Sequence, residues 1–440
     1  MAVRRDTICA LASGPPPSAI SVIRVSGPDT RNIIRSCLSV ETLRPRHAHL
    51  VDILSSDGAL IDTGLATYMA EPASYTGEDT LEISIHGGRI VTELTLKSLM
   101  ENGARLAEPG EFTRRAFEAG KLDLTRAEAV ADLIDAETEA QHKQALKQMD
   151  GALEALYSNW RTQLTDSLAL LEASIDFPDE DDAPTRVDGP VKQRLEDLQT
   201  DLAEALATGN ITERIRDGFK IAILGKPNAG KSTLLNQLAK RDAAIVTDIP
   251  GTTRDIVEVR LVLGGYLVWV ADTAGLRETA DVVEAEGVRR AHRAADEADL
   301  RIWLYDARDS FDFDQVRPRD LIVANKSDLA DPDTVSRETL KISAKLGTGV
   351  DYVEEALISR LSDLTGEVSA PMITRARHRQ GIERATEYIE SALAQLDQMA
   401  GAEFVAEDVR WAARELGTLT GHVDPEMVLG AVFSSFCIGK

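Results

Sequence analysis

The 440-residue chain is poor in cysteine and in positive charge, and each shortage excludes classes of protein. Its three cysteines, Cys9, Cys37 and Cys437, have a spacing that fits neither a disulfide framework nor a zinc site, so the sequence predicts a protein of the reducing cytoplasm. Its 49 Lys and Arg residues face 73 Asp and Glu residues, which gives a formal net charge of -24. Since such a surface repels polyanions, a nucleic-acid substrate would have to be held at a local patch or by a partner protein.

Long hydrophobic runs are absent as well. The uncharged stretch Thr7–Ile23 follows two arginines, as the core of a signal peptide would. Asp6 and the break at Gly14–Pro17 argue against a signal peptide, because such a peptide needs a continuous apolar helix. The uncharged stretch Met427–Gly439 is shorter than the roughly 20 residues that cross a bilayer. The sequence therefore predicts no membrane segment.

The spacing of apolar residues divides the chain into segments of different character. Residues 1–118 alternate short β-like runs with turns, which is typical of a mixed α/β domain. Helical periodicity dominates residues 119–212 and 368–440, where apolar stripes such as the one through Leu146, Leu153 and Trp160 predict the core of a helical bundle. Strand–helix alternation over residues 213–367 predicts a parallel α/β sheet. We expect the two helical segments to pack together, with the α/β domain inserted between them.

The stretch GKPNAGKS, Gly225–Ser232, matches the phosphate-binding pattern G-x-x-x-x-G-K-[ST], between an apolar strand and a helix. Glycines allow backbone N–H groups to turn towards phosphate oxygens. Lys231 would place its charge on the β- and γ-phosphates, and the Ser232 hydroxyl would bind magnesium beside the helix N-terminus. The residues predicted to hold the nucleotide here are Asn228, Ala229, Gly230, Lys231 and Ser232 of this stretch and Thr233, which follows it.

Three further motifs follow in the order of a guanine-nucleotide site. DTAG closes an apolar strand, and Asp272 can reach magnesium through water. NKSD offers at Asp328 a carboxylate that can accept both the ring N–H and the exocyclic amine of guanine, a donor pair that adenine lacks. SAK would support the base from its other side. The residues predicted here are Asp272, Thr273, Ala274, Gly275, Asn325, Lys326, Ser327, Asp328, Ser343, Ala344 and Lys345. Together the motifs predict a Ras-like P-loop GTPase and exclude an ATPase.

Leu276 stands where many signalling GTPases have a glutamine that orients the attacking water. An apolar side chain cannot orient water, so hydrolysis needs another orienting group and another source of positive charge. The stretch TDIPGTTRD, Thr247–Asp255, predicts the first switch, with Thr252 or Thr253 as a magnesium ligand. A turn in this loop, together with Asn228, could hold potassium against the phosphates. The switch residues predicted at the site are Thr247, Asp248, Ile249, Pro250, Gly251, Thr252 and Thr253.

These motifs, with the upstream PGEFTRRAF and KLDLTRAEAVADLIDA, the DFPDE loop and the terminal FCIGK, resemble the MnmE/TrmE family of tRNA modification GTPases over essentially the whole chain. The resemblance implies an N-terminal folate-binding domain that forms a homodimer, a discontinuous helical domain and an inserted GTPase domain. It implies that the GTPase domains meet across the dimer when GTP and potassium are bound. The family modifies carbon 5 of the wobble uridine of certain tRNAs, adding an aminomethyl or carboxymethylaminomethyl group. It acts with the flavoprotein MnmG (GidA), and the carbon comes from a tetrahydrofolate in its 5-formyl or 5,10-methylene form.

The resemblance also assigns roles to single residues. The positions that match the family's folate contacts are Arg24, Glu82, Lys121 and Lys440. Those that match its potassium ligands are Asn228, Thr247, Ile249 and Thr252, and those that match its magnesium ligands are Ser232 and Thr253. Glu284 matches the carboxylate that positions the attacking water, and Cys437 would lie beside the one-carbon carrier. One departure is the loop at Pro15–Pro17, where three prolines remove backbone donors.

Two other functions fit some of the motifs. A ribosome-assembly GTPase would carry the same nucleotide motifs, but such proteins commonly add a basic RNA-binding domain, and only Arg375–Arg379 is locally basic here. A lipidated signalling switch is disfavoured by Leu276 and by the tail, since Gly439 and Lys440 do not fit a prenylation motif. Co-purification with a flavoprotein or with ribosomal particles would separate the first of these from the tRNA-modifying function.

Overall fold

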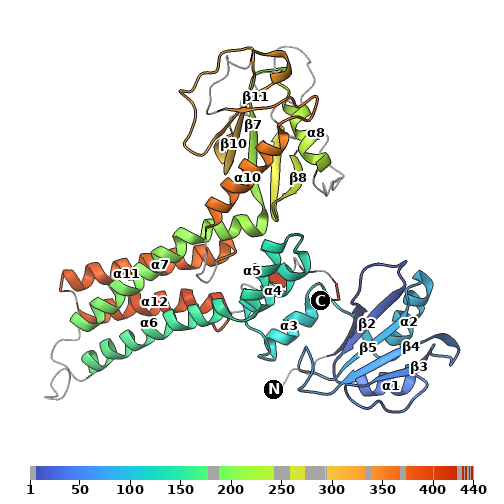
Figure 1. Cartoon of the computed structure of the whole chain (residues 1–440). Coiled ribbons are helices and arrows are strands. Elements are labelled where there is room, and N and C mark those ends of the chain that lie inside the picture. Colours follow the sequence, from blue (N-terminus) through green and yellow to red (C-terminus); the bar gives the residue numbers. More distant parts are fainter. Residues whose placement is uncertain are drawn as a thin grey trace, which may run out of the picture. The chain divides into compact units, whose positions relative to one another are not determined.

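The computed structural model describes most of the chain, and contacts between α-carbons divide it into two units. The described residues are 6–176, 188–241, 258–272, 293, 295–331, 339–366, 373–399, 401–423, 429, 430, 432, 433, 436, 438 and 439. Unit 1 comprises Met1–Ala131, Met149–Lys192 and Tyr388–Lys440, and unit 2 comprises Asp132–Gln148 and Gln193–Glu387 (Figure 1).

A six-stranded sheet forms the N-terminal part of unit 1, with the strand order β3-β4-β5-β2-β1-β6. The strands are β1 (Thr7–Leu11), β2 (Ile20–Ser26), β3 (Ala48–Leu54), β4 (Leu60–Met69), β5 (Thr80–His86) and β6 (Ala104–Leu106). Neighbouring strands are antiparallel except β1 and β6, which run parallel. Helices α1 (Thr30–Cys37) and α2 (Arg89–Glu101) pack on this sheet. The predicted mixed α/β domain is confirmed.

Two of the cysteines lie in the core of this N-terminal part. Cys9 and Cys37 are fully buried among apolar side chains such as Ile23, Ile33 and Leu81. Burial raises the pKa of the Cys9 thiol to about 11, so the thiolate that reactive cysteines need does not form near neutral pH. These two residues are therefore packing groups.

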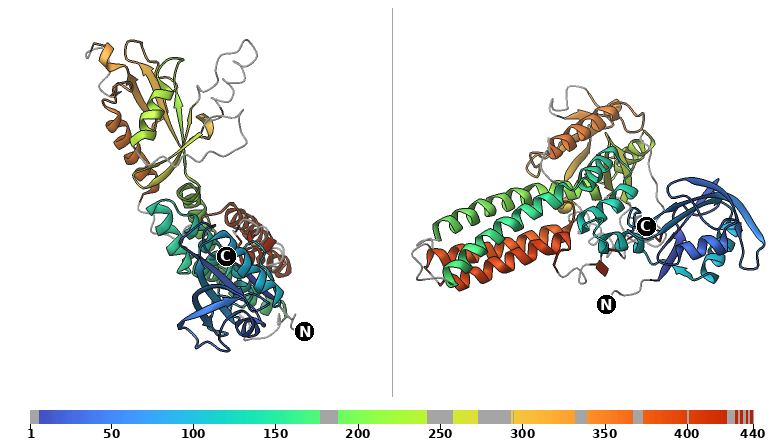
Figure 2. Two further views of the ribbon diagram at one scale, coloured as in Figure 1. Left: turned by 90° about the vertical axis from the view of Figure 1, so that its right-hand side faces the viewer. Right: turned by 90° about the horizontal axis from the view of Figure 1, so that it is seen from below.

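Helices make up the rest of unit 1. They are α3 (Glu111–Glu118), most of α4 (Leu124–Asp135), α6 (Ala152–Asp176), the last part of α11 (Ala376–Asp397) and α12 (Ala402–Thr420). Helices α6 and α12 lie side by side (Figures 1 and 2). Leu153 and Trp160 of α6 are buried, as their spacing predicted, whereas Leu146 is 40% exposed. The apolar stripe is interrupted because the chain breaks at Gly151, whose φ of +88° ends one helix before the next begins.

A second six-stranded sheet forms the centre of unit 2, with the strand order β12-β11-β10-β7-β9-β8. The strands are β7 (Phe219–Leu224), β8 (Glu258–Leu263), β9 (Tyr266–Asp272), β10 (Leu300–Asp306), β11 (Leu321–Asn325) and β12 (Leu340–Lys341). All neighbours run parallel except the edge strand β8, which pairs antiparallel with β9. Gly264 and Gly265 join these two strands with φ of +55° and +85°, as a two-residue type I′ hairpin turn requires. The predicted parallel α/β sheet is confirmed, with one antiparallel edge.

The helices of unit 2 include α8 (Lys231–Arg241), the short η1 (Ser327–Leu329) and α10 (Val350–Thr365). Most of α5 (Glu139–Met149) and of α7 (Asp188–Asp217) also belong to this unit. The Gln141 side-chain amide donates to the Arg216 carbonyl at 2.8 Å, and that of Gln144 donates to the Thr212 carbonyl at 3.0 Å. These bonds hold α5 on α7, and Ala140 of α5 packs against the core of the sheet.

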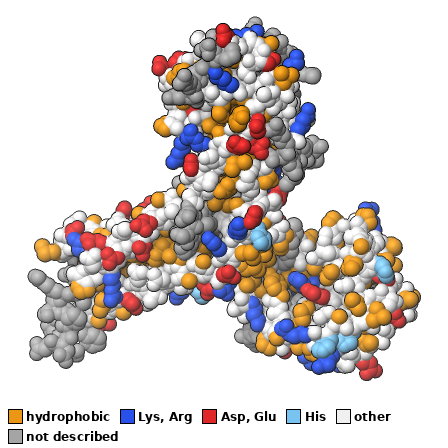
Figure 3. Space-filling view, viewed as in Figure 1, with side chains coloured by type: hydrophobic (Ala, Val, Ile, Leu, Met, Phe, Trp, Pro, Cys, Tyr) orange, Lys and Arg blue, Asp and Glu red, His pale blue; other side chains and the backbone are white. Residues whose placement is uncertain are grey.

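No helix in the described part of the chain combines the length and the apolar character that a bilayer span requires. Figure 3 shows acidic, basic and hydrophobic side chains interspersed over the visible face of the molecule. Some exposed apolar side chains are neighbours: Leu50 of β3 and Leu65 of β4 are paired in register and are 74% and 47% exposed.

Candidate functional site

The stretch GKPNAGKS forms the loop between β7 and α8 and the first two residues of α8, so the strand and helix predicted around it are present. Gly225 has a φ of +149°, and a β-carbon there would overlap the carbonyl oxygen of Leu304. Gly230 has a φ of +100°, and a β-carbon there would overlap the side-chain amide of Asn325. Both positions therefore require glycine, because only glycine combines a positive φ with so close an approach.

The Lys231 side chain is buried inside this loop. Its ammonium donates to the carbonyl oxygens of Gly225 at 2.7 Å and of Lys226 at 3.0 Å. The loop thus holds a positive charge at its centre, beside the first backbone N–H groups of α8, which is the donor set that a polyphosphate needs. Ser232 and Thr233 are exposed in the first turn of α8, and Asn228 is exposed at the tip of the loop with a φ of +62°.

The side chain of Asn325 joins three of the predicted nucleotide segments. Its amide nitrogen donates to the carbonyl of Ala229 at 2.7 Å. Its amide oxygen accepts from the backbone N–H groups of Lys326 at 2.8 Å and Ala344 at 2.9 Å. Asn325 is only 3% exposed, so its hydrogen bonds are shielded from water. Hydrogen bonds in such a low-dielectric interior are stronger than those at the surface. An amide can both donate and accept, and no charged side chain could replace it here.

The residues predicted to bind the base lie at the ends of β11 and β12. Asp328 is exposed on η1, next to the buried Asn325, and Lys345 is exposed after the buried Ser343 and Ala344. Lys326 has a φ of +61°, and its ammonium pairs with the Asp306 carboxylate at 2.9 Å. The turn that carries Ser343 is closed by a hydrogen bond from the Ser343 N–H to the Thr348 carbonyl, at 2.9 Å.

Two charged residues beside the base segment were not predicted from the sequence. Arg308 contacts both carboxylate oxygens of Asp306, at 2.9 and 2.7 Å. The hydrogen bonds from Arg308, together with those from Lys326, hold the pKa of Asp306 well below its usual range. No motif marks Asp306 or Arg308, but Asp306 ends a strand adjacent to β11, where parallel strands bring functional side chains together.

Part of the predicted nucleotide site lies outside the described residues. These positions are Thr247, Asp248, Ile249, Pro250, Gly251, Thr252, Thr253, Thr273, Ala274, Gly275 and Glu284. The backbone of Asp272 is described and ends β9, opposite Ile223 of β7. Of the predicted metal ligands, the structure describes Ser232 and Asn228, each of which carries an oxygen that suits a hard cation.

A second candidate site surrounds Arg24 in unit 1. Arg24 and Glu82 are paired in register on β2 and β5, and the guanidinium contacts the Glu82 carboxylate at 2.9 Å. The same guanidinium lies 5.4 Å from the ring centroid of Tyr75 and 5.5 Å from that of Phe112. The Tyr75 hydroxyl is hydrogen-bonded to that of Thr113 at 2.9 Å. The structure therefore brings two of the predicted folate contacts together, beside two aromatic rings that the sequence did not single out.

The described part of the C-terminal tail lies near this site. Phe433 and Phe436 contact the backbone at Gly110, which precedes α3. Gly439 lies on the backbone of Leu11 and Ala12, at the end of β1. Strand β1 is the neighbour of β2, and its Ala10 is opposite Arg24. Among the other predicted residues, Lys121 lies beside Gly77, whereas Cys437 and Lys440 lie outside the described residues.

Models of known protein families match nearly the whole chain. The model of the family described as GTP-binding protein TrmE N-terminus matches residues 7–121, and that of the MnmE helical domain matches residues 124–437. The chain is 56% identical over 438 residues to the tRNA modification GTPase MnmE of Hyphomonas neptunium, covering 99% of each chain. It is 51% identical over 449 residues to that of Caulobacter vibrioides, covering 99% of this chain and 100% of the relative. The chain therefore belongs to the MnmE (TrmE) family.

Proposed function

We propose that this tRNA modification GTPase depends on potassium and acts with a flavoprotein on carbon 5 of the wobble uridine. The GTP-dependent part of this proposal rests on the hydrogen bonds of the Asn325 side chain. They connect the phosphate loop to the two segments that are predicted to bind the base. Phosphate and base contacts are thereby held at a set separation before a nucleotide binds, which lowers the ordering cost of binding. The name tRNA modification GTPase, which both relatives carry, supports the same function.

The nucleotide site supplies contacts to the phosphates, to the metal ions and to the base. Lys231 binds the β- and γ-phosphates, Ser232 holds magnesium, and Asp328 selects guanine through its paired donors. Magnesium and potassium, when bound, supply positive charge to the phosphates. Asn228 is suited to contact potassium, because its side chain is exposed at the tip of the loop. Thr247, Ile249 and Thr252 complete this set, Thr253 is the second magnesium ligand, and Glu284 positions the water.

The site around Arg24 is proposed to bind a tetrahydrofolate. A carboxylate such as Glu82 can accept from the donor edge of a pterin, and the ion pair with Arg24 holds that carboxylate in place. Tyr75 and Phe112 supply apolar surface beside the guanidinium. Tetrahydrofolate, when bound, supplies the carbon that is added to the uridine. Lys121, Cys437 and Lys440 are proposed to complete this site, Cys437 beside the carbon that is transferred.

The proposed domain organisation follows the family. Residues 1–118 form the folate-binding domain, residues 119–212 and 368–440 form the helical domain, and residues 213–367 form the GTPase domain. We propose a homodimer through the N-terminal domain, and the exposed apolar pair Leu50 and Leu65 supports such an interface. The proposed partners are GTP, tRNA and the flavoprotein MnmG (GidA) in a heterotetramer or larger complex, and the proposed location is the cytoplasm.

A reconstituted reaction tests the proposal. The purified chain is mixed with its flavoprotein partner, GTP, magnesium, unmodified tRNA, 5,10-methylenetetrahydrofolate and an amine donor (ammonium or glycine), and modified uridine is measured by mass spectrometry. We expect modification only when GTP, potassium and the folate are all present. Modification without the folate would remove the carbon donor from the proposal. Association of the chain with ribosomal particles, in place of the flavoprotein, would favour a ribosome-assembly GTPase.

A further inference from the structure

A polar joint in unit 2 connects the β8–β9 hairpin to α5 and α7. Arg260 of β8 contacts the carboxylate of Glu137, just before α5, at 2.8 Å. Its guanidinium also lies 5.2 Å from the ring centroid of Trp269, the residue opposite it on β9. The Trp269 indole donates to the carbonyl of Asp217, the last residue of α7, at 2.8 Å. Arg260 and Trp269, both in the β8–β9 hairpin, thus contact the start of α5 and the end of α7.

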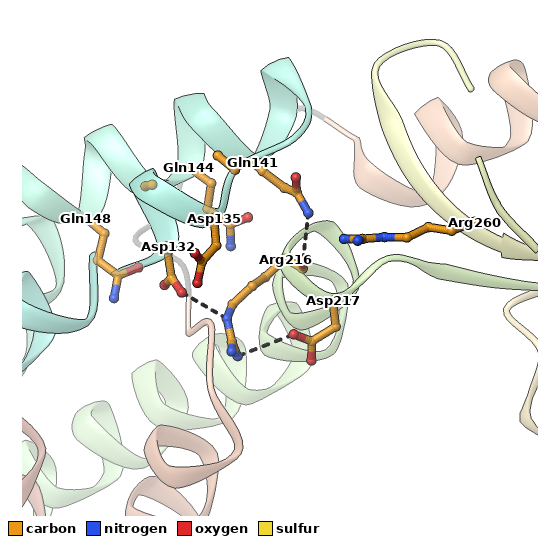
Figure 4. Close-up of a pocket in the computed structure, with 10 residues that line it drawn as sticks. Asp132, Asp135, Gln141, Gln144, Gln148, Arg216, Asp217 and Arg260 are labelled. Carbon is orange, nitrogen blue, oxygen red and sulfur yellow. Dashed lines mark hydrogen bonds and ion pairs between the residues drawn. The ribbon is translucent and has the colours of Figure 1, made fainter. Parts of the chain in front are cut away.

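The position of Glu137 is determined by the start of α5. The side-chain oxygen of Gln141 accepts from the N–H groups of Glu137 at 2.9 Å and Thr138 at 3.1 Å, while the Thr138 hydroxyl accepts from the Gln141 N–H at 3.2 Å. This reciprocal arrangement is a capping box, which satisfies free backbone N–H groups at the start of a helix. The same Gln141 side chain donates to the Arg216 carbonyl of α7, as Figure 4 shows. Glu137 is therefore a defined anchor for Arg260.

A cavity of about 250 Å³ is lined in part by Arg260 (Figure 4). It is lined by Asp132, Gln141, Gln144, Gln148, Arg216 and Arg260, among others. Two buried atoms at this cavity have no hydrogen-bond partner among the described residues, the Nε of Arg260 and the side-chain oxygen of Gln144. Because the cavity leaves space beside Arg260, its ion pair with Glu137 and its contact with the Trp269 ring determine where its side chain lies.

We propose that Arg260 is a positioning residue for GTP hydrolysis, which it supports by tying the β8–β9 hairpin to α5 through Glu137. The hairpin matters because β9 ends at Asp272, three residues beyond Trp269, and Asp272 begins the DTAG motif. Residues 247–255, which the sequence predicts to be the first switch, precede β8 by only a few residues. A displacement of about 1 Å at a reacting centre can lower a rate by about two orders of magnitude. This inference rests on the proposed GTPase function.

The test separates nucleotide binding from turnover in the full-length protein. Glu137→Gln and Arg260→Gln each remove one charge of the pair. We expect each to lower kcat for GTP by about three- to ten-fold while the Kd of a fluorescent GDP analogue changes less than about two-fold, because the phosphate loop is untouched. The double variant should lie within about two-fold of either single variant, since both remove one interaction. Arg317→Gln is the matched control: its ion pair with Asp296, at 3.0 Å, is in the same unit but exposed, and its kcat should not change.

Amide hydrogen exchange with GDP bound provides a second measurement that does not depend on turnover. Exchange over residues 258–272 should be faster in Glu137→Gln and Arg260→Gln than in the wild type, and unchanged in Arg317→Gln. Arg260→Lys should fall between wild type and Arg260→Gln, because lysine keeps the charge but loses the planar contact with Trp269. Multiplicative effects of the two substitutions on kcat, or unchanged exchange in the hairpin, would overturn the inference. A wild-type protein that binds GDP but does not hydrolyse GTP would instead overturn the proposed function.

Discussion

Gly439 lies directly against the carbonyl oxygen of Leu11, so closely that a β-carbon on Gly439 would overlap that oxygen. Its φ of +98° is one that L-residues with side chains rarely adopt. Leu11 is opposite Ile23 of β2, the residue before Arg24. The C-terminal tail therefore reaches the strand next to the candidate folate site, and a glycine two residues after Cys437 allows the approach.

Substitution of Gly439 should separate the two proposed activities. Gly439→Ala would displace the tail from β1, so we expect tRNA modification to fall by at least about ten-fold. GTP turnover should not change, since all the residues predicted to bind the nucleotide lie between residues 225 and 345. Gly430→Ala is the matched control, because a β-carbon at Gly430 would meet no atom of the described residues within 4 Å. Equal losses in the two variants would mean that any change in the tail region is harmful and that the contact with Leu11 has no special role.

Potassium should stimulate GTP hydrolysis, and sodium should stimulate it little. The reason is that Leu276 cannot orient water, so a cation held by Asn228 and the Thr247–Thr252 loop is needed to supply charge. Asn228→Gly removes the amide but keeps a residue that tolerates the φ of +62°. This variant should lose more of its response to potassium than of its affinity for GTP. Initial rates measured in KCl and NaCl at equal ionic strength decide the matter, and equal rates in the two salts would refute the potassium site.

Asp328 should determine the choice of base. Asp328→Asn replaces a double acceptor with an amide that presents a donor to the extra carbonyl of xanthine. We expect a strong loss of GTP affinity, of about two orders of magnitude or more, and a shift of preference towards xanthosine triphosphate. Competition of the two nucleotides against a fluorescent GDP analogue measures the shift. Unchanged selectivity for guanine would remove Asp328 from the base-binding role.

Cys437 should be needed for tRNA modification only. Cys437→Ser replaces a thiol with a weakly acidic hydroxyl, which cannot substitute for it if nucleophilicity matters. We expect GTP turnover to remain nearly intact and modification to be abolished, both measured on one preparation. Survival of both activities would make the thiol incidental. A joint fall of both would identify the tail as a folding element.

Asp306 should make stability depend on pH. Because Arg308 and Lys326 hold its folded pKa below the unfolded value of about 4, Asp306 contributes stability that is present above that value and is lost as the pH falls towards the folded pKa. Asp306→Asn should therefore lower the free energy of unfolding by about 1 kcal/mol at pH 7. The difference from wild type should shrink as the pH falls from about 5 towards 3. Urea unfolding at several pH values measures this, and a constant difference would contradict the ion-pair role.

The sequence by itself was sufficient to predict those features of the protein that are formed by residues close together in the chain. A phosphate loop needs glycines, a lysine and a hydroxyl within eight residues between a strand and a helix, so the spacing in Gly225–Ser232 predicts both the chemistry and the elements around it. The alternation of strands and helices likewise predicted a parallel sheet. Periodicity was less reliable across Gly151, because a stripe of apolar residues does not show where one helix ends.

Tertiary structure alone decided which distant residues meet. Asn325 bonds to Ala229, 96 positions away, because parallel strands place both segments at one edge of the sheet. Arg24 meets Glu82 because of the register of β2 and β5, and Arg260 meets Glu137 because α5 lies on α7 beside the hairpin. A motif describes neighbours along the chain, where covalent geometry limits the choices. Contacts between separate segments depend on register and packing of the whole unit, and no short pattern of residues encodes them.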